Sequence, residues 1–116
     1  MRHRKQQIKL GRTKGPKKAL MRSLLESFIM HGHIKTTETK AKAMRLVVEP
    51  LITKAKTGSL TATRAAKKVL YTEEAIKKLM TEIGPKYATR PGGYTRVIKL
   101  PVRKNDSAKM ARIELV

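Results

Sequence analysis

A pair of glycines with arginines on either side is the most distinctive local feature of this sequence. The stretch from Arg90 to Arg96 reads RPGGYTR, in which Gly92 and Gly93 lie between a proline and a tyrosine. Glycine pairs near cations allow backbone amides to approach a phosphate closely. The residue types therefore predict phosphate binding, either of a nucleotide in a pocket or of the backbone of a nucleic acid.

The order of the expected elements favours the nucleic acid. A nucleotide-binding glycine loop follows a strand and opens a helix, so that the phosphate meets the helix N-terminus. Here the glycines follow a helical pattern and precede a strand pattern. A plain turn into the strand explains the glycines equally well. The neighbouring cations Arg90, Arg96 and Lys99 favour phosphate contact. Tyr94 could stack on a base or ribose, or pack at the edge of a sheet.

The residues that could support catalysis or bind a metal do not form a recognisable set. His31 and His33 flank Gly32 at an expected helix end, without the carboxylate or cysteine neighbours typical of a metal site. Glu73 and Glu74 open a helix, where the helix dipole alone favours them. No phosphate loop or nucleophile elbow is present in the sequence. We therefore expect no enzyme, no metal, no cofactor and no small-molecule substrate.

Charge is the dominant property of the composition. The 116 residues include 28 Lys and Arg against 8 Asp and Glu, for a net charge of +20. Such self-repulsion implies a polyanionic partner, and nucleic acid is the leading candidate. There is no cysteine, which is consistent with a reducing compartment, and no apolar run long enough to span a membrane. The expected location is the cytoplasm.

Residues 1–16 are expected to form a basic N-terminal extension. Nine Lys and Arg residues precede the first carboxylate, Glu26. Its apolar content is too low to offset the entropy of ordering it alone. We expect this arm to be mobile when free and to become ordered on phosphates. A merely solubilising tail is the other interpretation.

Residues 17–116 are expected to form one α+β domain, with about four helices packed on a small sheet of about three strands. Helical periodicity covers 17–31, 38–58 with a bend at Pro50, 62–70, and 73–83, where Gly84-Pro85 is expected to close the helix. Alternation predicts strands at 33–37, 94–102 and 110–116. In the second strand, Tyr94 is expected on the same side as Arg96 and Ile98. Pro101 favours an edge position for that strand.

Several segments together resemble a known family. They are MRHRK at the start, IKTT at 34–37, KAKAMRLVVEPLITKAKTG at 40–58, GPKYATRPGGYTRVIKL at 84–100 and ARIELV at the end. In this order they resemble the bacterial large-subunit ribosomal protein seventeen family. The resemblance implies a structural constituent of the 50S subunit that binds 23S ribosomal RNA beside other ribosomal proteins near the nascent-chain exit.

The resemblance implies RNA contacts at matching positions of this sequence. These are Arg2, His3, Arg4 and Lys5 in the arm, Lys35 in IKTT, and Arg90, Gly92, Gly93, Tyr94 and Arg96 in the loop. Charge density alone adds Lys9, Arg12, Lys14, Lys17, Lys18, Arg22 and Lys99. Because aromatic residues are few, we expect recognition of folded RNA shape rather than a stacking platform for single strands.

Two other functions are compatible with the charge. An architectural DNA-binding protein of the nucleoid would have a similar size and basicity, although such proteins use apolar wedges on arms, and this arm lacks a proline-tipped ribbon. A basic amphipathic protein on anionic membranes would need apolar helix faces that here are expected to form the core. RNA binding remains the favoured interpretation.

Overall fold

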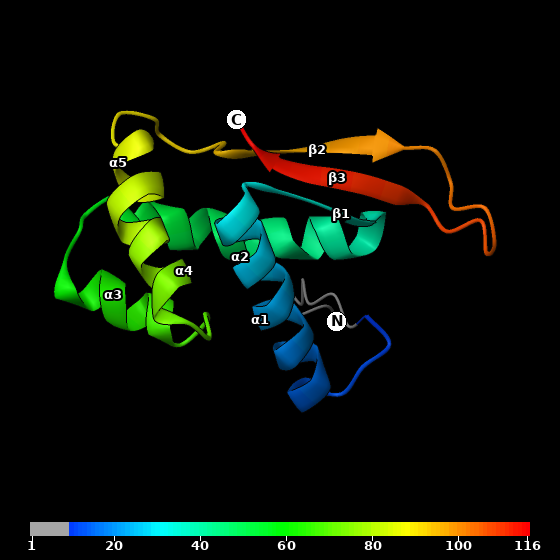
Figure 1. Cartoon of the computed structure of the whole chain (residues 1–116), viewed down its shortest axis with the longest axis horizontal. Coiled ribbons are helices and arrows are strands. Elements are labelled where there is room, and N and C mark those ends of the chain that lie inside the picture. The colour runs from blue at the N-terminus through cyan, green and yellow to red at the C-terminus, as the bar shows by residue number, and fades with distance from the viewer. Residues whose placement is uncertain (1–9) are drawn as a thin grey trace, which may run out of the picture.

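The computed structural model describes residues 10–116 and consists of a three-stranded antiparallel sheet with helices packed on one side of it (Figure 1). The elements in chain order are α1 (Lys14–His31), β1 (His33–Thr37), α2 (Glu38–Ala55), α3 (Leu60–Lys67), α4 (Glu73–Lys78), η1 (Leu79–Ile83), α5 (Gly84–Lys86), β2 (Thr95–Leu100) and β3 (Met110–Leu115). The predicted α+β class is confirmed. The predicted contacts at Arg2, His3, Arg4, Lys5 and Lys9 lie outside the described residues.

The sheet has the order β1-β3-β2, so the last strand of the chain lies between the other two. Lys35 of β1 lies opposite Arg112, and Ile98 of β2 lies opposite the same residue on its other side. The short β-branched segment at 33–37 is thus the third strand, as predicted. β2 is an edge strand that ends at Leu100, immediately before Pro101, which lacks the amide needed to continue a ladder.

α2 is the central helix of the fold, because it contacts all three strands as well as α1, α3, η1 and α5. Its apolar stripe buries Met44, Val48 and Ile52 completely. Pro50 lies within the helix, which continues to Ala55. The other fully buried large side chains, Leu25, Phe28, Ile29, Leu70, Leu79, Tyr94 and Ile113, complete a mainly aliphatic core.

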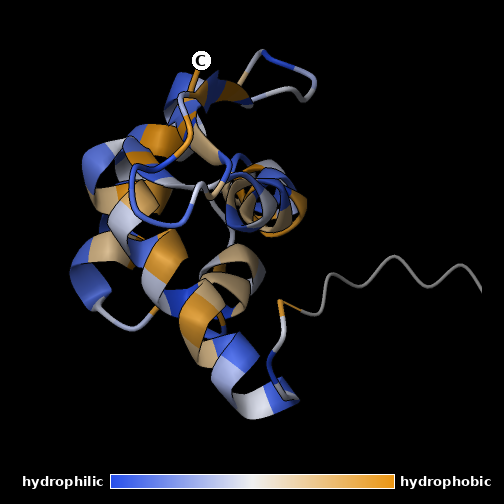
Figure 2. Cartoon of the chain, turned by 90° about the vertical axis from the view of Figure 1, so that its right-hand side faces the viewer, coloured by the Kyte–Doolittle hydropathy of each residue, from blue (hydrophilic) through white to orange (hydrophobic). Residues whose placement is uncertain are grey.

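α1 descends from the sheet and carries a hydrophobic band beside a hydrophilic one (Figure 2). It begins at Lys14, three residues before the predicted start at Lys17, and Thr13 occupies the N-cap position. It ends as predicted at Gly32, whose left-handed conformation lets its amide bond to the carbonyl of Phe28 at 2.7 Å. The turn at Gly32 leads directly into β1.

The prediction that Gly84-Pro85 closes the fourth helix is wrong. The helical path continues through the π-helical turn η1 and then α5, and it ends at Lys86, the last residue of α5. Gly84 is buried where the segment crosses α2, and a Cβ there would lie 2.8 Å from the carbonyl oxygen of Ala55. Gly84 is therefore a close-packing residue, and the proline occupies the first turn of α5, where a missing amide is tolerated.

Candidate nucleic-acid interface

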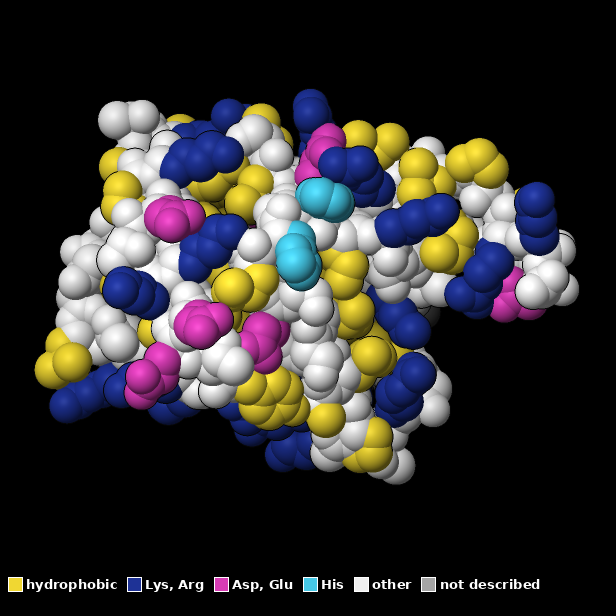
Figure 3. All heavy atoms as spheres, viewed as in Figure 1, with side chains coloured by type: hydrophobic (Ala, Val, Ile, Leu, Met, Phe, Trp, Pro, Cys, Tyr) yellow, Lys and Arg dark blue, Asp and Glu magenta, His cyan; other side chains and the backbone are white. Residues whose placement is uncertain are grey.

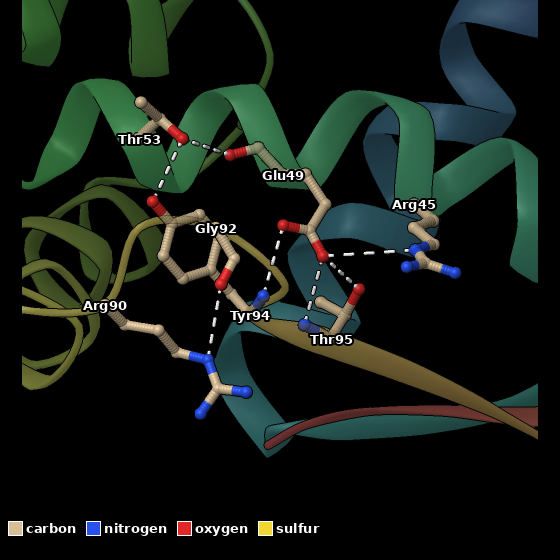
Figure 4. A network of polar contacts seen from close by, with 7 residues as sticks. All are labelled: Arg45, Glu49, Thr53, Arg90, Gly92, Tyr94 and Thr95. Atoms are coloured by element: carbon tan, nitrogen blue, oxygen red, sulfur yellow. Dashed lines mark hydrogen bonds and ion pairs between the residues drawn. The ribbon is translucent and has the colours of Figure 1, made fainter.

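The Gly-Gly loop is fastened to α2 by the carboxylate of Glu49 (Figure 4). One carboxylate oxygen accepts a hydrogen bond from the amide of Tyr94 at 3.2 Å. The other accepts from the amide of Thr95 at 3.1 Å and from its hydroxyl at 2.7 Å. The guanidinium of Arg45 lies 4.0 Å away. A carboxylate with this many donors fixes the point at which the loop enters β2.

Tyr94 belongs to the core, which corrects two expectations. Its side chain is 1% exposed, whereas Arg96 lies outside, so Tyr94 does not share the side of Arg96. Its ring packs 5.3 Å from that of Tyr87, between centroids. A ring enclosed in this way cannot stack on a base unless the loop opens. The hydroxyl contacts Thr53 at 3.2 Å and the ammonium of Lys56 at 3.1 Å.

The polar contacts of Tyr94 lower its pKa. The hydrogen bond with Thr53 is the largest cause, followed by the hydrogen bond and charge of Lys56, because both favour the phenolate. Lys56 also donates to the carbonyl of Arg90 at 2.6 Å. One ammonium thus connects the two ends of the loop to α2.

The loop presents bare backbone and a cation outward. Gly92 and Gly93 have φ angles of 111° and 60°, which residues that carry a Cβ rarely adopt. Nothing lies within 4 Å of the position a Cβ would take at either glycine, so the space beside them is open. Arg90 is exposed and donates from Nε to the carbonyl of Gly92 at 3.3 Å, which leaves its outer nitrogens available to a phosphate.

The outer face of the sheet, which we define as His33, Lys35, Arg96, Ile98, Arg112 and Glu114, continues from this loop. Two cross-strand rows form it: Lys35–Arg112–Ile98 and His33–Glu114–Arg96. Glu114 pairs with Arg96 at 2.7 Å and with Arg112 at 3.2 Å. The hydrogen bond from Arg96 is the main reason that the pKa of Glu114 is lowered. One carboxylate thus orients two guanidinium groups and leaves the face with a cationic surplus.

The β2–β3 hairpin carries further charged side chains, on the helix-facing side of β2 and at the hairpin tip. Lys99 is largely exposed and its ammonium lies 3.9 Å from Glu38, at the start of α2. Arg103 and Asp106 form a two-pronged pair at the hairpin tip, with distances of 3.0 and 2.7 Å. That pair lowers the pKa of Asp106 to about 2, chiefly through the hydrogen bond from Arg103.

The predicted cations near the N-terminus lie on a different part of the surface. Arg12, Lys14, Lys17 and Lys18 surround the start of α1. With a rise of about 1.5 Å per residue, the 18 residues of α1 place its start about 27 Å from β1. Sequence reasoning listed all these cations as one set, but the structure separates them into two surfaces.

Arg22, to which charge density assigned an RNA contact, is engaged within the protein. Its guanidinium donates to the carbonyls of Val69 and Leu70 at 3.2 and 3.0 Å. It also lies 4.1 Å from the ring centroid of Tyr71. Arg22 therefore satisfies carbonyls beyond the end of α3 and joins α1 to the α3–α4 connection.

Carboxylates are unevenly distributed over the described surface. On the face drawn in Figure 3, acidic side chains lie mostly over the helices at the left, while Lys and Arg dominate around the sheet and hairpin. Glu73 and Glu74 open α4, and Glu82 lies in η1. On the sheet side Glu38, Glu49, Asp106 and Glu114 each have a cation within 4.0 Å. The sheet-side carboxylates are thus each paired with a cation, and the unpaired Lys and Arg side chains among the described residues there leave a positive surplus.

Sequence reasoning missed three residues of this region. Glu49 and Lys56 anchor the loop across some 40 residues of sequence, a relationship that no local pattern indicates. Arg112 could have been found, because the alternation that buries Ala111 and Ile113 places it on the opposite face.

Neither a cluster of metal ligands nor a membrane-spanning helix is found among the described residues. Within 10–116, no three His, Cys, Asp or Glu side chains group as metal ligands. None of the helices over the same residues has the length and apolarity of a transmembrane span. A basic α+β domain with a fastened loop and a charged sheet face is typical of nucleic-acid-binding modules.

Comparison with known proteins identifies the family. The family model described as ribosomal protein L17 matches residues 20–116. Large ribosomal subunit protein bL17 of Gemmatimonas aurantiaca is 55% identical over 116 residues, covering 100% of this chain and 98% of that protein. The protein of that name from Halothermothrix orenii is 47% identical over 110 residues (95% and 96%), and that from Desulfovibrio desulfuricans is 49% identical over 116 residues (99% and 68%).

The chain therefore belongs to the ribosomal protein L17 family. The relatives are ribosomal proteins, a family not known to be enzymatic, as the sequence predicted.

Proposed function

We propose that this protein is a structural constituent of the large ribosomal subunit in the cytoplasm, where it binds 23S ribosomal RNA and supports subunit assembly and translation. The single observation that carries the RNA role is the combination of the open Gly-Gly backbone at 92–93 with the cationic outer face of the sheet beside it. The names of the relatives support the subunit.

Binding rests mainly on neutralised phosphates. Each cation that meets a phosphate releases a condensed counterion, so the affinity falls steeply with salt. Lys35, Arg96 and Arg112 project from adjacent strands and contact successive phosphates, while Glu114 holds the two guanidinium groups in position. Gly92 and Gly93 allow the RNA backbone to approach closely. Tyr94 contributes by shaping the loop from within the core.

A rigid platform also lowers the entropic cost of recognition. Glu49, Lys56 and Thr53 fasten the loop before any RNA arrives. Folded RNA is recognised through shape and backbone, which suits a preformed surface. The arm and the start of α1 form a second contact on the same RNA, about 27 Å away by the length of α1. Neighbouring ribosomal proteins near the nascent-chain exit are further partners that the family resemblance implies.

Two measurements test this function. The tagged full-length chain, expressed in a bacterium, should co-sediment with large subunits after a high-salt wash, and free chain should bind deproteinised 23S RNA more tightly than duplex DNA at matched salt. Tighter binding of DNA, with no retention on subunits, would instead identify an architectural nucleoid protein. Sedimentation with small subunits alone would contradict the proposed assembly.

A further inference from the structure

A cavity opens on the far side of the domain from the sheet, between the start of α1, the middle of α2 and the α3–α4 connection. Its volume is about 640 Å³. This lies within the range of about 300–1,000 Å³ that is usual for small-molecule and cofactor sites. Its lining divides into a cationic rim and an apolar floor, and neither the loop nor the sheet face takes part in it.

The rim consists of six cations: Arg12, Lys14, Lys17, Lys18, Arg22 and Lys68. None of the described residues that line the cavity is acidic. Arg22 is held by carbonyls, but the others have no carboxylate partner within 4.0 Å among the described residues. The first turn of α1 contains no acidic residue either, and the side chain of Thr13 makes no capping bond. The rim therefore favours a negatively charged occupant.

The floor consists of Met21, Leu25, Val47 and Val69. Leu25 is fully buried, and the other three are partly buried and pack on the core. A phosphate ion or the backbone of a duplex would neutralise the rim and leave this floor in contact with water. An apolar peptide would cover the floor and leave the cations unmatched. An occupant must therefore carry an anion and a flat, weakly polar group side by side.

We propose that this cavity takes one unpaired nucleotide of the ribosomal RNA, with its base against the apolar floor and its flanking phosphates on the cationic rim. The inference rests on the proposed RNA-binding function and adds to it a site for a single extruded base. Met21 is the flexible, polarisable surface against which the base lies. The charge of residues 2–9 disfavours them as the occupant of this cationic cavity, because they contain basic side chains and no carboxylate.

Methyl NMR on the full-length chain tests the site directly. The chain has six methionines, and their labelled methyl groups report on separate places. Met21 lines the cavity, whereas Met44 is wholly buried in the core and serves as the internal control. The conservative variant Met21→Leu assigns the resonance. The probes are a fully paired RNA hairpin and four hairpins that differ from it only by one bulged A, C, G or U.

We expect at least one bulged hairpin to move the Met21 methyl resonance upfield through the ring current of the base, with Met44 unchanged. The paired hairpin should bind without this upfield shift. Adenosine monophosphate and inorganic phosphate are titrated in parallel at the same concentrations. An equal upfield shift with the mononucleotide would indicate a free-nucleotide site and would overturn the assignment to RNA.

A charge-matched pair of variants gives a second readout. Lys17→Gln/Lys18→Gln removes two rim cations, and Lys54→Gln/Lys77→Gln removes two exposed cations outside the cavity. Only the first should reduce the preference for the bulged over the paired hairpin. If all hairpins bind equally and the Met21 resonance does not shift, the cavity does not hold a base, while the RNA-binding function stands. If no RNA binds, both the base site and the RNA-binding function are refuted.

Discussion

Glu49 holds Thr95 by two hydrogen bonds at once, one to its amide and one to its hydroxyl. The two residues are 46 positions apart, and their contact joins the middle of α2 to the first residue of β2. The Gly-Gly loop is therefore set in place by the half-buried carboxylate of Glu49.

Replacement of Glu49 should destabilise the fold as well as the loop. Glu49→Ala leaves two amides and a hydroxyl without their acceptor, at a cost of about 2–3 kcal/mol in the free energy of unfolding. Glu49→Gln keeps the shape and one acceptor and should cost less. Urea denaturation measures both, with Glu82→Ala as the control, because Glu82 is exposed on η1. Equal stability of Glu49→Ala and Glu82→Ala would refute the anchoring role.

Gly84 should be intolerant of even one methyl group. In Gly84→Ala the new Cβ would meet the backbone carbonyl of Ala55, which cannot rotate away, so α5 must shift from α2. We expect a loss of about 1–3 kcal/mol, as for other overpacked sites. Ser23→Ala is the control, because Ser23 is exposed in the middle of α1, where alanine favours the helix. A thermal melt that ranks the two variants in the opposite order would disprove close packing at Gly84.

The Arg103–Asp106 pair predicts a specific dependence on pH. Because Arg103 lowers the pKa of Asp106 to about 2 from the ordinary 3.8, the pair stabilises the hairpin tip at pH above 3.8. That contribution fades as the pH falls from 3.8 through about 2. Carboxyl NMR should give the low pKa, and Arg103→Gln should return it toward the ordinary value. Arg96→Gln should leave Asp106 unchanged; a shift of Asp106 in that variant would contradict a local pair.

The sheet face should contribute to RNA affinity through charge. Lys35 and Arg112 lie directly opposite each other, so Lys35→Gln/Arg112→Gln removes adjacent cations. We expect weaker binding of 23S RNA and a shallower dependence of log affinity on log salt, by about 0.7–0.9 per lost phosphate contact. The charge-matched control is Lys54→Gln/Lys77→Gln. Equal losses in the two pairs would mean that net charge, and not this face, determines binding.

The arm should contribute to affinity and not to the fold. Deletion of residues 1–9 retains Thr13 at the N-cap of α1, so the circular dichroism should stay nearly unchanged. The affinity for 23S RNA should fall strongly, because Arg2, Arg4, Lys5 and Lys9 are lost. Undiminished binding at physiological salt would show that the arm is a solubilising tail.

Local patterns predicted the elements well, because periodicity reports which residues face the core. The stripe from Met44 to Ala55 and the short strand at 33–37 were both identifiable from the sequence. The end of the fourth helical segment could not be identified from the sequence. A glycine followed by proline usually ends a helix, but here Gly84 packs closely against Ala55 and the helical segment continues past it.

The candidate site was less predictable, since its order depends on contacts between distant segments. The glycines and cations of RPGGYTR are visible in the sequence, yet the burial of Tyr94 follows from Thr53, Lys56 and Tyr87, which lie 7 to 41 positions away. Likewise, the sequence shows Arg22 only as a further cation, because its hydrogen bonds to the carbonyls of Val69 and Leu70 form only in the folded chain.

The central place of β3 in the sheet has a consequence for how the chain folds during synthesis. Among residues 10–116, β1 and β2 each pair with β3 alone, so neither forms this ladder until residues 110–115 have been synthesised. The helices can bury much of their own surface earlier, but the backbone groups of β1 and β2 that bond to β3 stay unpaired until then. A growing chain of this protein thus keeps its sheet, with the cationic outer face, unassembled until β3 has been synthesised.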